Sequence, residues 1–537
     1  MMTAAEQPEY EATSAAIAPT GAFRELGSFE KMLTQTRESH TKGEPGPTGP
    51  GMRTLTQPHI WAAVLNGDLM RPDLLRGVVV ALNRHPMLRV CIRKPNGEQE
   101  PVKNLLGEVR DDGDPLYFCS MECSSMEELA SQVVDEKILE VGADADSFES
   151  AWQKLLEENI DTAAFDISRG PNWRVQVVYI AHTLPCRLYQ VCTMNHALED
   201  QRSCNILLQD ILRGAAGEPT GPELPFPGSM ESSIVTGETF RPSTFGYLLS
   251  QAMGALSQPV LLGDNVPPEE VRGSDPAFGR DGRKTICEFA VLEGELVQRM
   301  LQTCRSKGVT LTAALCAASL MACSQAAHQM NDDRITKKYK FLMAVDLRRF
   351  GVRSGEDWTN GTVACAGGAL DFFKPTIHTS APLGRNLIQG HGKEKEQAEE
   401  TFWRLARQCK QVVNDFEKKG IARESVAVFD WAMNNMDIWE SVNIESRNTK
   451  TLGRAYTCGL SNMGRFPYDT EVGPFRLEKV HYATSHARCG SLFQLSCGTV
   501  DDKLCMTCQV AEPVVTREAA LQYLNLLIES LKATCAK

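Results

Sequence analysis

The sequence predicts an α/β protein of two similar lobes, each a mixed sheet flanked by helices. Its 537 residues exceed what one ordinary hydrophobic core organises. Residues 261–284 are rich in proline, glycine and charged residues and have little apolar periodicity. Patterns typical of strands and helices recur on both sides of this segment. We therefore expect an N-terminal lobe at 1–260, an interlobe linker at 261–284 and a C-terminal lobe at 285–537.

The N-terminal half predicts helices and strands in alternation. Apolar side chains recur at helical spacing from residue 71, and this helix should end before Pro86, whose ring cannot continue it. A strand is expected at 88–93, and two β-rich runs at 172–181 and 186–196 predict a hairpin. After His196 the apolar residues return to helical spacing. His196 is therefore expected at a strand-to-helix junction.

The C-terminal half repeats these patterns. Residues 393–420 predict a long amphipathic helix with many charges on its outer face. The other elements that we expect here are helices at 294–308, 310–327 and 516–533 and strands at 338–348, 456–466, 475–485, 491–499 and 503–510.

The charge balance argues against one class of partner. With 56 basic and 68 acidic residues the net charge is −12, which does not suit a surface that grips nucleic acid through its phosphates. The N-terminus lacks the charged and then apolar pattern of a secretory signal, and the longest apolar run, 311–323, is shorter than the roughly 18–20 residues that a bilayer demands. We expect a soluble, cytoplasmic, monomeric protein without a nucleic-acid partner or a membrane span.

The 18 cysteines predict reduced thiols, because disulfide frameworks are typical of short secreted chains. Cys505 and Cys508, with His486 and Cys489 nearby, leave a zinc site as an alternative. Residues three apart on a strand point to opposite faces, however, so core packing is the favoured interpretation. We therefore expect no metal.

The spacing between His196 and Asp200 has two interpretations, because an H-x-x-x-D pattern arises by accident about half a time per chain of this kind. In the first, Asp200 is a helix N-cap and His196 a polar residue at the end of a strand. In the second, His196 is a general base. The start of a helix just after it disfavours the imidazolium, which keeps the ring in the form that accepts a proton.

A neutral imidazole could take the proton of an alcohol as the alcohol attacks a thioester, with an expected gain of about 10²–10⁴ in rate. The reaction also needs hydrogen-bond donors for the oxyanion and two converging channels for the reactants, and a cleft between two lobes offers both. We expect Asp200 to fix the loop by pairing with an arginine.

The segment MNHALED, 194–200, resembles the H-H-x-x-x-D-G signature of the chloramphenicol-acetyltransferase-like superfamily. This superfamily includes alcohol O-acetyltransferases, polyketide-associated acyltransferases, plant-type CoA acyltransferases and peptide-synthetase condensation domains. The resemblance extends loosely over most of the chain, since further segments follow in the family's order. These segments are 23–32, 81–90, 165–178, 345–350, 460–464 and 493–504.

The resemblance implies that His196 is the general base and Asp200 the structural acid that binds an arginine. Arg348, in the stretch VDLRR, stands at the matching position, with a surface charge as the alternative. The resemblance also implies that Ser461 and Asn462 lie on the second lobe near the substrate channel, with an ordinary turn as the alternative.

Two positions depart from the signature and are candidates for channel or substrate contacts. Asn195 replaces the first histidine, which is tolerable because the second is the base. Gln201 replaces the glycine after the aspartate and places a long amide where the family leaves room. This amide could narrow the acceptor pocket, donate a hydrogen bond or signal drift from catalysis.

The resemblance implies an active site at the lobe interface and the transfer of an acyl group, expected to be acetyl, from a CoA thioester to an acceptor hydroxyl. We expect acyl-CoA as a co-substrate, a small-molecule alcohol as the acceptor and no permanently bound cofactor. Two alternatives stay open. One is a non-catalytic binding protein that kept the fold, and the other is an amine-accepting condensation enzyme that uses carrier-bound acyl groups.

Overall fold

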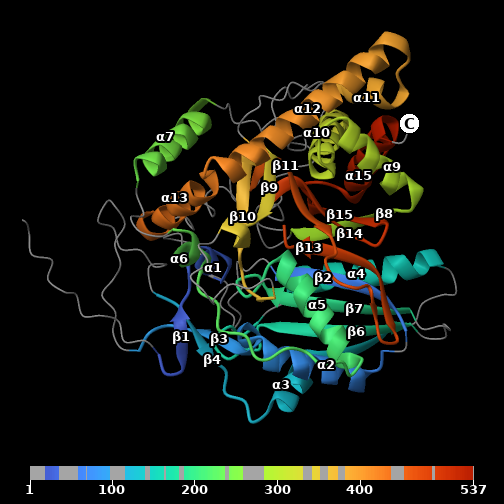
Figure 1. Ribbon diagram of the computed structural model, residues 1–537. Helices are drawn as coiled ribbons and strands as arrows, with labels where there is room; N and C mark the ends of the chain where they lie inside the picture. The colour runs from blue at the N-terminus through green and yellow to red at the C-terminus, as the bar shows by residue number, and fades with distance from the viewer. Residues whose placement is uncertain are drawn as a thin grey trace, which may run out of the picture.

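Two six-stranded mixed sheets flanked by helices organise the chain in the computed structural model (Figure 1). The predicted α/β class and its two-lobed arrangement are thereby confirmed. The structure describes residues 19–34, 58–67, 69–96, 115–139, 145–162, 165–180, 187–235, 241–257, 283–330, 341–350, 361–372, 381–436, 453–486 and 490–535.

The first sheet contains the predicted hairpin, whose two strands pair antiparallel from Trp173 opposite Met194 to Val178 opposite Tyr189. In spatial order its strands are β12 (Glu471–Val472), β13 (Phe475–Thr484), β2 (Pro58–Asn66), β7 (Arg187–Asn195), β6 (Trp173–Ile180) and β5 (Val134–Leu139).

Helices cover both faces of this sheet because its strands are buried on both sides. Along β2, Trp61 and Ala63 belong to one apolar core and Ile60 and Ala62 to another, as the alternation of side chains across a strand requires. The helices of this lobe are α2 (Arg71–Arg84), with the short η1 (Pro86–Arg89) after it, α3 (Met126–Val133), α4 (Ala145–Thr162) and α5 (Gln201–Ala215).

Helices α2 and α5 approach each other closely at two glycines. A Cβ added at Gly77 would lie 2.2 Å from the carbonyl oxygen of Ile211, and one added at Gly214 would lie 2.9 Å from the Cα of Gly77. This contact seats α5, whose first turn follows Asp200, against the neighbouring helix. As predicted, α2 ends before Pro86.

The C-terminal half completes the first sheet, because β13 pairs antiparallel with β2. In Figure 1 the late strand β13 lies beside the early strand β2. The boundaries 1–260 and 285–537 therefore do not coincide with the two sheets. The expected linker, 261–284, lies outside the described residues except for Arg283 and Lys284, and Lys284 already begins the strand β8 (Lys284–Leu292).

The second sheet lies in the other lobe and packs against a largely buried helix, α10, where the sequence predicts a helix at 310–327. Its strands are, in order, β10 (Gly367–Phe372), β9 (Phe341–Asp346), β11 (Arg454–Arg465), β14 (Gly490–Val500), β15 (Lys503–Glu512) and β8. Its helices are α9 (Glu295–Ser306), α10 (Leu311–Met330), η5 (Arg348–Phe350), α11 (Ala381–Gln389), α12 (Gly392–Lys418), α13 (Ile421–Asn435) and α15 (Arg517–Cys535).

A small third sheet lies beside the first lobe. Its central strand β4 (Tyr117–Ser120) pairs antiparallel with β1 (Ala22–Glu25) and β3 (Val90–Arg93). The remaining helices are α1 (Ser28–Thr34), α6 (Met230–Ile234) and α7 (Pro242–Ser257).

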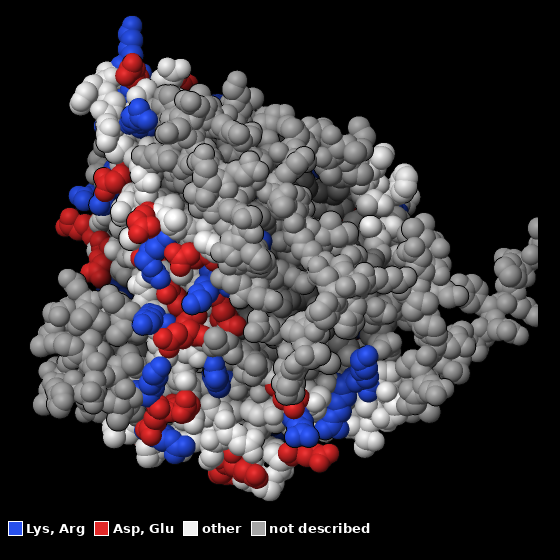
Figure 2. Space-filling view, turned by 180° about the vertical axis from the view of Figure 1, so that it is seen from behind, with Lys and Arg blue, Asp and Glu red and all other residues white. Residues whose placement is uncertain are grey.

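Acidic and basic side chains are interspersed over the described part of the face in Figure 2. Among the described residues no single helix is long and apolar enough to cross a membrane. Helices α9 and α10 reach that length and hydropathy only together, across a bend of 99°.

Candidate functional site

His196 lies directly after β7, in the turn that leads into α5. The backbone NH of Leu198 donates to the carbonyl oxygen of Asn195 at 3.0 Å, and the Asn195 side-chain oxygen accepts from the NH of Ala197 at 3.0 Å. Asn195 is fully buried, so its side chain shapes this turn from within. The strand-to-helix junction that the sequence predicts is therefore present, with His196 on it.

One nitrogen of the His196 ring is already engaged within the turn. Nδ1 lies 2.8 Å from the carbonyl oxygen of Glu199, and since a carbonyl only accepts, Nδ1 carries the hydrogen. In the neutral ring Nε2 is then the acceptor. The His196 side chain is 18% exposed, so the ring is not sealed by its neighbours.

The surroundings of His196 favour the neutral ring. Burial lowers the pKa of His196 below its ordinary value of 6.5, a charge on His59 lowers it further, and the Glu199 carboxylate acts in the opposite direction. The net effect is a lowered pKa, so Nε2 is free to accept a proton at neutral pH.

Asp200 caps α5 and also binds Arg348 of the second lobe, so both functions considered for this residue coexist. Its Oδ1 accepts from the NH of Ser203 at 2.9 Å, which is the N-cap hydrogen bond. Arg348 Nη1 donates to Oδ2 at 2.6 Å and Nη2 donates to Oδ1 at 3.0 Å, which is the bidentate geometry of a strong ion pair. Both side chains are buried.

The Asp200 carboxylate stays charged despite its burial. Burial alone would raise the pKa of Asp200, but the Arg348 guanidinium and hydrogen bonds from Arg348, Ser203 and the backbone of Ala366 outweigh it and hold this pKa below the ordinary value. Ser203 Oγ and Arg348 Nη2 also contact the carbonyl oxygen of Ala364, each at 2.9 Å. The start of α5 is thus fastened to the second lobe at several points.

A buried network lies on the other side of His196. His59, from β2, has its Nδ1 2.8 Å from Glu199 Oε1, and its ring stacks on that of His196 with centroids 4.9 Å apart. Cys204, in the first turn of α5, donates from Sγ to Glu199 Oε2 at 3.0 Å. The side chains of His59, Glu199 and Cys204 are almost completely buried.

Gln201 and Ser461 join the two lobes by a second contact, in which Ser461 Oγ donates to Gln201 Oε1. Asn462 has a different environment. Its Nδ2 donates to Thr312 Oγ1 at 2.9 Å, and its Oδ1 accepts from the NH of Gly464, a glycine with positive φ. The structure therefore brings Ser461 to the start of α5. Asn462 instead contacts α10 and lies where the register of β11 shifts, so both residues belong to a strand and not to a turn.

Three residues around the site have the spacing of metal ligands. One ligand atom each from His59, His196 and Glu199 lies within 4.8 Å of the others, and within the described ranges this is the group with such geometry. The hydrogen bonds among Glu199, His59 and Cys204 account for this arrangement without an ion.

The zinc alternative at Cys505 and Cys508 finds no support in the register of β15, although Cys489 lies outside the described residues. Cys505 lies opposite Gly498 and Cys508 opposite Leu495, three positions along one strand, so they face opposite sides of the sheet. Both are buried free cysteines.

Three further histidines, His85, His481 and His486, are buried and hydrogen-bonded. His85 Nε2 lies 2.7 Å from Asp210 Oδ2, His481 Nδ1 lies 3.2 Å from Thr507 Oγ1, and His486 Nε2 lies 3.2 Å from Thr484 Oγ1. Burial is the main cause that lowers the pKa values of His481 and His486 to about 3. They stabilise the fold as neutral rings.

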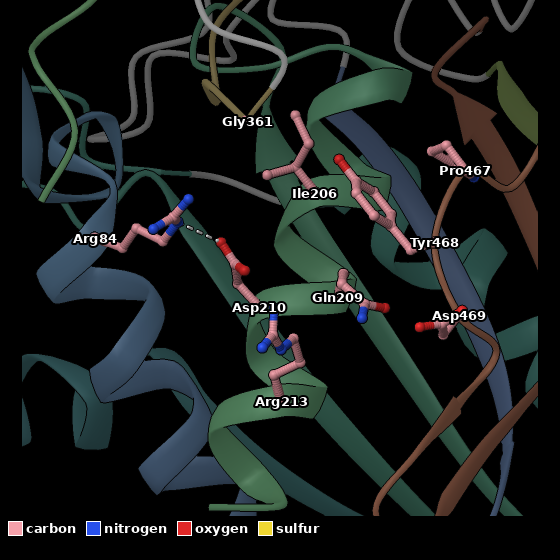
Figure 3. Close-up of a pocket in the computed structure, with 9 residues that line it drawn as sticks. All are labelled: Arg84, Ile206, Gln209, Asp210, Arg213, Gly361, Pro467, Tyr468 and Asp469. Carbon is pink, nitrogen blue, oxygen red and sulfur yellow. Dashed lines mark ion pairs between the residues drawn. The ribbon is translucent and has the colours of Figure 1, made fainter. Parts of the chain in front are cut away.

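A pocket of about 340 Å³ opens elsewhere along α5, between the end of α2 and the loop after β11 (Figure 3). Its two arginines already have partners, because Arg84 pairs with Asp210 and Arg213 with Glu218. Its lining includes Tyr468 but none of the predicted site residues. This pocket is therefore separate from the His196 turn.

Sequence reasoning missed the His59, Glu199 and Cys204 network. Glu199 was visible as an acidic residue inside the motif, between His196 and Asp200. His59 gave no signal, because its approach depends on the pairing of β2 with β7, which puts it opposite Met194.

Comparisons with known proteins identify similar structures but no similar sequence. No protein-family model and no curated protein sequence matches the chain. A trichothecene 15-O-acetyltransferase from Fusarium sporotrichioides is similar over 95% of this chain and 95% of its own, with 12% identity and a TM-score of 0.64.

Two condensation domains have the same arrangement. The one from the monacolin K polyketide synthase is similar over 89% of this chain and 92% of its own, with 12% identity and a TM-score of 0.53. The first condensation domain of the CDA synthetase is similar over 89% and 91%, with 10% identity and a TM-score of 0.55. This chain therefore has the same two-lobed fold as these acetyltransferase and condensation-domain structures, as the resemblance predicted.

Proposed function

We propose that this protein is an O-acyltransferase that moves an acyl group, acetyl in the simplest case, from a CoA thioester to an acceptor hydroxyl. The observation that carries the proposal is the tautomer of His196. Since Nδ1 donates to the carbonyl oxygen of Glu199, the lone pair of Nε2 is available on a ring that is partly exposed. A lowered pKa that keeps this ring neutral is what a general base for an alcohol requires.

In this reaction the hydroxyl oxygen of the acceptor attacks the thioester carbonyl carbon while its proton passes to Nε2 of His196. The tetrahedral intermediate then collapses, the bond between carbon and sulfur breaks, and the imidazolium returns the proton to the leaving sulfur. The products are the ester and free CoA, and His196 is neutral again. No covalent enzyme intermediate is formed.

Asp200 and Arg348 act on His196 through the backbone. Their buried ion pair anchors the start of α5 to the second lobe, and the turn that carries His196 ends at Asp200. A fixed turn keeps Nε2 in position. This contributes to the rate, because a displaced base is no longer well placed to take the proton of the acceptor. Gln201 and Ser461 are proposed to border the substrates, since they meet where the two lobes join.

Acyl-CoA is proposed as a co-substrate and a small alcohol as the acceptor, without a permanently bound cofactor. The fold likeness to condensation domains favours one second candidate, an amine-accepting enzyme that takes its acyl group from a carrier protein. The contact of Gln201 with Ser461 favours a further candidate, a non-catalytic binding protein in which the Gln201 amide fills the substrate site.

One experiment separates the three functions. Purified protein is incubated with acetyl-CoA or with an acetylated carrier protein, each with a panel of alcohols and of amines, and released thiol and acylated product are measured. The proposal predicts ester formation from acetyl-CoA with alcohols. Product from the loaded carrier and amines alone would favour condensation, and no product in any arm would favour the binding protein.

A further inference from the structure

We propose that Glu199 and His59 are positioning residues that set how readily His196 takes up a proton. This inference rests on the proposed role of His196 as the general base, and it concerns two residues to which the family signature gives no role. The buried pair of the Glu199 carboxylate and the His59 imidazole has no role in the mechanism above.

The Glu199 carboxylate lies beside both imidazole rings, near the Nδ1 atom of each. Its Oε1 is 2.8 Å from His59 Nδ1 and 4.0 Å from His196 Nδ1, and its Oε2 accepts from Cys204 Sγ at 3.0 Å. The Glu199 side chain is 0% exposed and the His59 side chain is 2% exposed. Charges at these separations interact strongly because little water screens them.

Glu199 contacts the His196 ring in two ways. Its carbonyl oxygen accepts the hydrogen of Nδ1, which fixes the tautomer, and its carboxylate approaches the same nitrogen. When Nε2 accepts the substrate proton, the ring becomes positive while a carboxylate oxygen of Glu199 lies 4.0 Å from its Nδ1. The carboxylate therefore stabilises the imidazolium that forms during the reaction.

His59 has the opposite effect when it carries a proton. Its ring stacks on His196 at 4.9 Å between centroids, so a positive charge on His59 disfavours a second one on His196. Burial, and then a charged His59, lower the pKa of His196, whereas Glu199 raises it. Among the described residues, the titratable and charged groups around this ring and its network come from several elements. They are His59 on β2, Cys192 on β7, Glu199 and Asp200 in the turn, Cys204 on α5, Cys365 before β10, Tyr482 on β13, and Arg348 through Asp200.

The test follows the proton affinity of His196 without any substrate. Diethyl pyrocarbonate modifies neutral imidazole, so its rate of reaction with His196 as a function of pH gives the midpoint of titration. Trypsin releases His196 in the peptide 188–202, which contains no other histidine, and mass spectrometry then reports on this residue alone. The parent protein is compared with Glu199→Gln and His59→Gln.

Loss of the carboxylate charge in Glu199→Gln should lower the midpoint by about one pH unit, a tenfold loss of proton affinity. His59→Gln should raise it, because it removes a ring whose charge disfavours the imidazolium of His196. Asp210→Asn is the matched control, since Asp210, on α5, also pairs with a buried histidine, His85. It should leave the midpoint of His196 unchanged.

Folding of each variant is checked by thermal unfolding. If Glu199→Gln does not fold, His59→Gln alone tests the inference, which predicts a raised midpoint for His196. Unchanged midpoints in the folded variants, or a shift of equal size in Asp210→Asn, would overturn the inference. Because the reagent reports on His196 without acyl donor or acceptor, absence of acyltransferase activity would refute the proposed function and leave this result intact.

Discussion

Arg348 donates two hydrogen bonds to the carboxylate of Asp200, and this buried pair joins the turn after His196 to the second lobe. The side chains are only 7% and 9% exposed, so the pair is shielded from water. A buried charge without a partner would destabilise the folded protein. The pair therefore contributes both to the stability of the fold and to the geometry of the candidate site.

Replacement of Arg348 by Met should destabilise the protein by about 3–5 kcal/mol, because Asp200 then keeps a buried charge without a partner. Denaturant unfolding measures the loss. The matched control is Arg349→Met, which removes an exposed ion pair with Glu417 and should cost less than about 1 kcal/mol.

The Arg348→Met loss should also depend on pH. The pKa of Asp200 is held below its ordinary value of 3.8 in the folded protein, so the pair contributes stability above that pH and loses it as pH falls through the folded pKa. The difference between parent and variant should therefore shrink in acid. Equal losses for the Arg348 and Arg349 variants at neutral pH would contradict this account.

The pH dependence of the rate should reflect the lowered pKa of His196. Protonated His196 cannot accept a proton, so kcat/KM should fall in acid, with a midpoint below 6.5 because burial lowers the pKa. Initial rates in buffers of constant ionic strength measure the profile. A midpoint above 6.5 would indicate that the carboxylates around the ring outweigh its burial.

Replacement of Gln201 by Gly should raise kcat/KM for bulky acceptors relative to small ones, because it removes the amide that contacts Ser461. The matched variant Ser461→Ala breaks the same hydrogen bond but leaves the bulk of the amide in place. Acceptors of graded size measure the effect. An identical size dependence in the two variants would mean that Gln201 does not limit the space for the substrate.

A methyl group at Gly77 should destabilise the protein by about 1–3 kcal/mol, because it would lie 2.2 Å from the Ile211 carbonyl oxygen where α2 meets α5. Gly246→Ala is the control, since Gly246 is also inside a helix but has nothing within 4 Å of the added atom. That change should be neutral or stabilise by up to about 1 kcal/mol. Thermal unfolding measures the stability change in both variants. Equal changes would show that α2 and α5 do not approach each other closely at Gly77.

Local sequence patterns predicted most of the helices and strands. Alternation of apolar residues predicted the β6 and β7 hairpin, and helical spacing after His196 predicted α5, because each pattern depends on neighbours in sequence. The pairing of β13 with β2 was not predictable in this way. A strand pattern states which face is buried but does not name the partner strand, so the division at 261–284 missed this crossover.

The candidate site was predictable only in part for the same reason. His196 and Asp200 lie in one short motif, and the order of segments in the resemblance led to Arg348. His59 is far from the motif in sequence and reaches it only through the register of β2 on β7. Glu199 was in view, but its role depends on that partner.

The most direct test of the central claim compares thiol release from acetyl-CoA in the presence of alcohols for the parent protein and for His196→Ala. The exposed His391→Ala is the control. The account predicts that His196→Ala loses about 10²–10⁴ in kcat/KM and that His391→Ala keeps the parent rate. Equal rates for parent and His196→Ala would contradict a general base at this position.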